Sequence, residues 1–173
     1  MSSTAVLWLL RLIHILSGVF WVGGFMVFAR FVFPAALAVG PAAGPVMDQL
    51  IRVRKLPRAL LGAGTLTILS GLGLYWRDSV GSGSAWAGSP TGRVFGIGAL
   101  LAVIAFVIGV SVNAPAGQRL TALTAEIQAK GGPPTPEQSA QVQRLQKRLG
   151  TGMRVIAVLL VLATAAMALA RYA

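Results

Sequence analysis

The chain has 173 residues, of which 55% are hydrophobic and 11% are charged, and its formal net charge at pH 7 is +11. A soluble domain usually carries about 25% charged residues, so this composition indicates an integral membrane protein, organised as one membrane domain over 1–173. The sequence contains no cysteine, which excludes disulfides, thiolate metal sites, iron–sulfur clusters and covalent haem attachment through a CxxCH motif.

The basic excess would suggest nucleic-acid binding in a soluble protein. Here most lysines and arginines lie at the ends of apolar runs, where they set topology and meet anionic headgroups. We therefore expect membrane lipids as partners and no nucleic acid.

The first predicted membrane helix covers 4–33 and holds the only histidine of the chain, His14. Pro34 is predicted to end this helix, because the residue before a proline is disfavoured in the helical region. Ionisable groups inside an apolar run are expensive in a bilayer, so each needs a physical reason. One helical face, defined by spacings of three or four residues, collects Arg11, His14, Gly18, Trp21 and Phe25.

The segment between the first two spans is predicted to be a connector over 34–45 and a short interfacial helix over 47–55. The second membrane helix is predicted over 57–76, and a Gly/Ser-rich loop follows at 77–90. Small residues at helical spacing let a neighbouring backbone, or a flat cofactor, approach closely. In this helix they are Gly64, Thr67 and Gly71.

The third and fourth membrane helices are predicted over 91–114 and 152–172, with Pro115 kinking or breaking the chain after the third. Between them, 116–150 shows apolar residues at i, i+3 and i+7 on two segments, which predicts an antiparallel helical hairpin.

Two local signals divide this hairpin. The run Gly131-Gly132-Pro133-Pro134 predicts a helix stop, and Thr135 with Gln138 predicts a capping box at the start of the next helix.

The predicted fold is therefore all-α, a bundle of four transmembrane helices with a short cytoplasmic hairpin extension between helices three and four. The connection between helices one and two and the connection between helices three and four are both rich in Lys and Arg, whereas the opposite side of the bundle has few. The positive-inside rule then places both termini outside, in a multi-pass protein of a bacterial inner (cytoplasmic) membrane.

His14 has three candidate roles: an axial ligand of haem b, a proton carrier in a polar path, or a structural residue hydrogen-bonded to a hydroxyl or carbonyl on a neighbouring helix. The haem interpretation uses its neighbours. Gly18 would leave room for a porphyrin face, and Arg11 would pair with a propionate. The walls of the site would come from Trp21, Phe25 and the residues Gly64, Thr67 and Gly71.

A single histidine rules out bis-histidine ligation of haem within one chain. The second axial position is then a methionine, a water or empty, and Met167 on the outer half of the fourth helix is the best placed of Met26, Met47, Met153 and Met167. A homodimer that shares one haem between two copies of His14 is a further alternative.

Several motifs resemble one group of small bacterial membrane proteins. They are Arg11-x-x-His14 with Trp21-Val22-Gly23-Gly24, the stretch 66–75, Pro115 with Arg119-Leu120, and the ending 167–172. In this order they resemble the CopD-like and HemJ-like proteins. The resemblance implies a four-helix membrane bundle, with haem b or protoporphyrin chemistry in HemJ-like members and copper handling in CopD-like members.

We expect a small b-type haem protein with His14 as ligand, serving electron transfer or redox chemistry near the outer face, with a redox partner or quinone. The alternatives are a CopD-like protein for metal or small-solute transport or binding, with His14 and Met167 as metal ligands, and a structural or assembly subunit. The sequence leaves open whether the protein is an enzyme, and identifies no catalytic residue.

Overall fold

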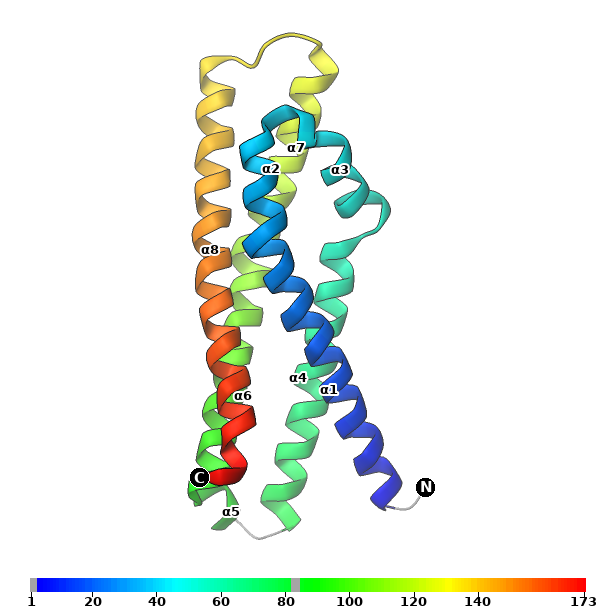
Figure 1. Ribbon diagram of the computed structural model, residues 1–173, viewed down its shortest axis with the longest axis vertical. Helices are drawn as coiled ribbons and strands as arrows, with labels where there is room; N and C mark the ends of the chain where they lie inside the picture. The colour runs from blue at the N-terminus through cyan, green and yellow to red at the C-terminus, as the bar shows by residue number, and fades with distance from the viewer. Residues whose placement is uncertain (1–2, 82–84) are drawn as a thin grey trace.

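The structure, a computed structural model, describes residues 3–81 and 85–173, and nearly all of them are helical. Two antiparallel helical hairpins make up the molecule, α1 with α4 and α6 with α8, and both chain ends lie at the same end of the pair (Figure 1). The elements in chain order are α1 (Ser3–Val27), η1 (Phe28–Val32), α2 (Phe33–Val39), η2 (Gly40–Ala43), α3 (Gly44–Asp48), η3 (Gln49–Val53), α4 (Leu56–Gly81), α5 (Ala85–Gly88), α6 (Pro90–Ile108), η4 (Gly109–Asn113), α7 (Ala114–Lys130), α8 (Pro136–Leu169) and η5 (Ala170–Tyr172).

Four continuous helical runs in the described residues are long and apolar enough to cross a membrane. At most 28% of the most apolar window of any run is buried inside the molecule, so most apolar side chains face outward. A soluble protein rarely exposes so much apolar surface, whereas a bilayer solvates it. This is the pattern of a multi-pass membrane protein. The runs are Thr4–Val53, Leu56–Gly81, Pro90–Lys130 and Pro136–Tyr172.

The helices continue through Pro34 and Pro115, so the prediction that Pro34 ends the first helix was wrong. In each case a five-residue π-turn, η1 or η4, lies just before the proline. The wider turn moves the hydrogen-bond register by one residue, so that the amide of Phe33 donates to the carbonyl of Phe28. The proline then falls in the first turn of the next α-helix, where its missing N–H costs nothing.

Two predicted loops are also largely helical. The connector 34–45 forms α2, η2 and the start of α3. The predicted Gly/Ser loop is replaced over most of its length by the end of α4 and by α5, while residues 82–84 lie outside the described residues. In α5 the indole of Trp86 packs edge-on to Tyr75 and stacks on Phe95, with ring centroids 5.3 and 6.2 Å apart. Through these ring contacts α5 packs against both α4 and α6.

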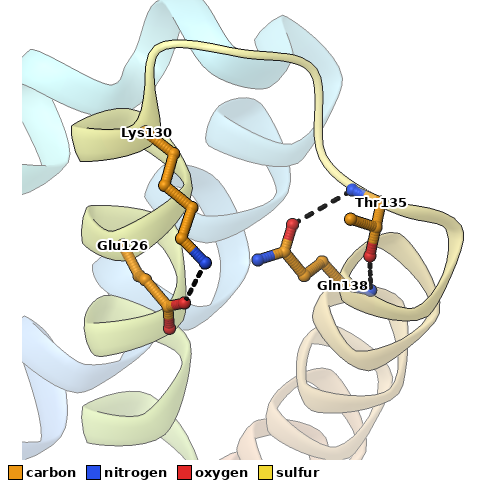
Figure 2. Close-up of polar contacts among 4 residues, drawn as sticks. All are labelled: Glu126, Lys130, Thr135 and Gln138. Atoms are coloured by element: carbon orange, nitrogen blue, oxygen red, sulfur yellow. Dashed lines mark hydrogen bonds and ion pairs between the residues drawn. The ribbon is translucent and has the colours of Figure 1, made fainter.

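The turn between α7 and α8 follows the sequence signals. Gly131 adopts a left-handed conformation, φ +67°, directly after α7. The hydroxyl of Thr135 accepts from the amide of Gln138, and the side chain of Gln138 accepts from the amide of Thr135 (Figure 2). The predicted stop and capping box are confirmed. The ammonium of Lys130 lies 2.7 Å from the carboxylate of Glu126 in the last turn of α7 (Figure 2).

Two apolar clusters hold the helices together. The first joins all four runs and consists of Trp21, Ala63, Ala105, Ile156 and Leu160. The second joins α2, α7 and α8 and consists of Phe33, Ala116, Leu145, Leu149 and Met153. Neither cluster reaches the end of the molecule where the termini lie. Toward that end α1 runs away from α8, while α4 stays near α6 and is linked to it through α5 (Figure 1).

Candidate functional site

A cavity of about 190 Å³ lies between the two hairpins on the side of the termini. We call it the inter-hairpin cleft. Five residues singled out in the sequence line it: Arg11, His14, Thr67, Gly71 and Met167. The structure therefore brings the histidine and the preferred methionine to one cavity, from α1 and α8. Further lining side chains that the sequence did not identify are Tyr75, Asp78, Trp86 and Phe95.

The imidazole of His14 is held by the backbone of the facing helix. Its Nδ1 lies 2.8 Å from the carbonyl oxygen of Thr67. A carbonyl oxygen only accepts, so a proton is assigned to Nδ1, and the tautomer that has its single proton there carries its lone pair on Nε2. Within the described residues Nε2 has no hydrogen-bond partner. A backbone carbonyl on one ring nitrogen is the arrangement that orients a histidine for binding through the other.

A line of polar groups continues from His14 along the contact between α1 and α4. The hydroxyls of Ser17 and Thr67 lie 2.9 Å apart. Thr67 Oγ1 donates its one proton to the carbonyl of Ala63 and therefore accepts in the contact with Ser17. Ser70 Oγ lies 2.5 Å from the carbonyl of Leu66 and 3.2 Å from that of Thr67. Ser17 was missed in the sequence, although its spacing of three from His14 places it on the same helical face. The carbonyl of Thr67 is held in place by the backbone of α4, and it orients the ring of His14.

At two glycines of α4, the space where a Cβ would lie is occupied by side chains of α1. A Cβ on Gly71 would lie 2.7 Å from Cε1 of His14, and a Cβ on Gly64 would lie 2.9 Å from the indole of Trp21. A Cβ on Gly18 would lie 3.5 Å from Cγ2 of Thr67, which is ordinary packing. The small-residue stripe of α4 therefore serves close approach of the two helices.

Four predicted site residues do not line the inter-hairpin cleft: Gly18, Trp21, Phe25 and Gly64. Trp21 is only 6% exposed and meets Phe106 edge-on, with ring centroids 6.0 Å apart. Phe25 packs against both apolar clusters. The structure places these residues in the helix packing.

The cleft combines apolar walls with charge. Arg11 is exposed and forms no ion pair among the described residues, whereas Asp78 pairs with its neighbour Arg77 at 3.6 Å. The rings of Tyr75, Trp86 and Phe95 supply an aromatic wall. Such a cavity suits an apolar ligand that carries an anionic group, because Arg11 lines it and has no ion-pair partner among the residues described.

The donor atoms limit which groups the cleft can hold. Among the described residues there is no cluster of three or more histidine, cysteine, aspartate or glutamate side chains. The candidate donors are the imidazole Nε2 of His14 and the thioether of Met167, an N/S pair that suits a haem iron or a soft metal ion. Ligand pockets usually measure about 300–1,000 Å³, so the enclosed 190 Å³ holds only part of a macrocycle.

Comparison with family models, curated proteins and solved structures finds no match for this chain. The resemblance to CopD-like and HemJ-like proteins stays a prediction. The function has to be inferred from the geometry of the inter-hairpin cleft.

Proposed function

We propose that this protein is a small b-type haem-binding integral membrane protein, with Nε2 of His14 as an axial ligand of the iron. One observation carries the proposal: the only histidine of the chain lines the inter-hairpin cleft, with Nδ1 anchored to the carbonyl of Thr67 and the Nε2 lone pair left over. Bound haem would supply one-electron redox chemistry, which suits electron transfer in a membrane.

The chain's own residues have distinct parts in this proposal. Thr67 fixes the tautomer and the orientation of the His14 ring. Met167 approaches from the other hairpin and is the candidate second ligand, while Arg11 is available to pair with a propionate. Because the cavity is smaller than a usual porphyrin site, a bound haem would need room beyond the 190 Å³ that these residues line.

An absorption spectrum of the protein, purified after haem-replete expression, tests this. We expect a Soret band that is lost in His14→Ala and shifted in Met167→Leu. Met26→Leu is the matched control, because Met26 is half-buried and does not line the cleft. A colourless wild-type protein, or a His14→Ala variant with an unchanged band, would contradict the proposal.

A second candidate is binding or transport of a soft metal ion such as Cu(I) through His14 and Met167. The enclosed volume of about 190 Å³ favours it, because an ion needs far less room than a macrocycle. Imidazole and thioether are both suitable Cu(I) ligands. One metal ion per chain, lost in both His14→Ala and Met167→Leu and accompanied by no Soret band, would replace haem with this candidate.

A structural role is the third alternative, and the bond from His14 to Thr67 favours it by tying α1 to α4. In that case His14→Gln retains the fold and changes no cofactor or metal content.

The topology that we propose places both termini outside a bacterial inner membrane and the α7–α8 extension in the cytoplasm. The support is the concentration of Lys and Arg in 52–58 and 119–154, combined with the positive-inside rule. Because the chain has no native cysteine, single cysteines report accessibility directly. An impermeant maleimide applied to intact cells should label Ala85→Cys and spare Ala129→Cys, and the reverse pattern would overturn this orientation.

A further inference from the structure

A groove on the opposite half of the molecule is lined by cations. It measures about 450 Å³ and lies where α8 passes the π-turn η4. We call it the basic groove, and its lining residues are Val112, Arg144, Lys147, Arg148, Thr151 and Gly152. None of these residues lines the inter-hairpin cleft, so the two sites are separate.

The three cations of the basic groove have no anionic partner. Their spacing of three and four residues puts Arg144, Lys147 and Arg148 on neighbouring positions of α8. The salt bridges found in the described residues involve none of them, and no acidic residue lines the groove. Like charges at this spacing destabilise a helix, and a bound anion relieves that repulsion.

The groove also contains a neutral hydrogen-bond donor. Thr151 is exposed, and its hydroxyl forms no hydrogen bond within the part of the chain that the structure describes. Gly152 contributes no side chain to the floor. The side chain of Asn113 occupies the place that a Cβ on Gly152 would take, since that Cβ would lie 2.9 Å from Cγ of Asn113. A shallow floor, a hydroxyl and three cations suit a phosphate group with its ester oxygens.

The position of the groove identifies the kind of phosphate. One further exposed cation, Arg154, follows on α8, and from Val155 onward the helix is apolar, with Val155 and Val158 exposed. On the other side the groove is bounded by the half-buried Val112 of η4. A headgroup in the groove would thus have its acyl chains along an apolar surface that already needs lipid.

We propose that the basic groove is a binding site for an anionic phospholipid, with the headgroup phosphate held by Arg144, Lys147 and Arg148. The acyl chains lie on Val112 of η4 and on the exposed Val155 and Val158 of α8. This site is independent of what the inter-hairpin cleft binds.

The test uses the full chain in a neutral detergent, titrated with phosphatidylglycerol or phosphatidylcholine, with bound lipid counted by native mass spectrometry. We expect one phosphatidylglycerol to bind preferentially. The variant Arg144→Gln/Lys147→Gln/Arg148→Gln should bind it at least about tenfold more weakly, since losing one charge-assisted hydrogen bond already corresponds to a factor of that order.

The matched control is Arg54→Gln/Lys55→Gln/Arg58→Gln. These three cations are exposed, form no ion pair among the described residues and do not line the groove. We expect the control to bind phosphatidylglycerol within about twofold of the wild type, because binding depends on direct contact in the groove. Equal weakening of both triple variants would show that total charge alone attracts the lipid, and would overturn the proposal.

Two more arms complete the test. Inorganic phosphate that displaces phosphatidylglycerol at equal concentration would overturn the lipid assignment, because the site would then select a free phosphate. If the triple variant does not purify as a folded protein, the single variants Arg144→Gln and Arg148→Gln replace it, each expected to weaken binding by at least about threefold. Unchanged binding in either the triple variant or both single variants would overturn the proposal.

Discussion

The two hairpins share a construction and differ in what joins their helices. In each, a membrane helix widens into a π-turn of five residues that ends two positions before a proline, and continues beyond it. In the first hairpin the contact between α1 and α4 is made by glycines and polar groups, with His14, Ser17 and Thr67 linked by hydrogen bonds. In the second, α8 packs on α6 through buried apolar residues such as Ala105 and Leu160.

This difference assigns the hairpins different parts in the candidate site. A backbone carbonyl can orient an imidazole only where small residues let the helices come close, and Gly71 provides that approach in the first hairpin. The second hairpin contributes Met167 and part of the aromatic wall. The first hairpin thus holds the oriented donor, and the second closes the cavity opposite it.

The largest expected effect is in the apolar contact of the second hairpin. Leu160 is 1% exposed, so Leu160→Ala should lower the free energy of unfolding by about 2–4 kcal/mol, through lost contacts and the cavity that remains. Reversible unfolding in mixed micelles measures it. The control Leu162→Ala, at a position 50% exposed on the same helix, should cost much less. Equal losses would show that α8 does not pack on α6 through this face.

The next effect tests the contact between α8 and η4. Gly152→Ala should cost about 1–3 kcal/mol, because the new Cβ overlaps the buried amide of Asn113. Asn113→Ala in the same chain should recover most of that loss, since it removes the overlapping atoms. A double-mutant cycle on unfolding free energies measures the coupling. Strict additivity would place the Asn113 side chain elsewhere.

A smaller effect tests the glycine that receives His14. Gly71→Ala should cost about 1 kcal/mol, the order expected for pushing the imidazole off its rotamer, and should remove its bond to Thr67. Gly73→Ala is the matched control, because its Cβ would meet Leu10 at an ordinary 3.7 Å. Thermal unfolding and the absorption spectrum are the two measurements. An unchanged spectrum in a haem-loaded Gly71→Ala variant would argue against His14 as the ligand.

The smallest effect concerns a single polar contact in the first hairpin. Ser17→Ala should cost about 0.6 kcal/mol, the average for a hydrogen bond between membrane helices. The control is Ser111→Ala, because Ser111 is exposed and bonds only to the carbonyl of Val107 in its own helix. A larger loss in Ser111→Ala would show that the polar line between α1 and α4 adds no stability.

Features that depend on neighbouring residues were predictable from the sequence. Apolar run length determines which helices can cross a membrane, and four such helices are present. The helix stop at Gly131 and the capping box of Thr135 with Gln138 need only residues within one turn, and both were predicted. Pro34 misled because its effect depends on the register of the preceding turn, which η1 changes.

The candidate site divides along the same line. The sequence by itself determined that His14 is the one imidazole ligand that this chain offers. It also identified Arg11 and Thr67 as residues of the same candidate site. Only the tertiary structure decided that the Thr67 carbonyl accepts a hydrogen bond from Nδ1 and that Met167 lines the same cleft. It also decided that Gly64 and Gly18 lie in the helix packing. The physical reason is that helical periodicity specifies which residues share a face, whereas the rotation and separation of two helices specify which faces meet.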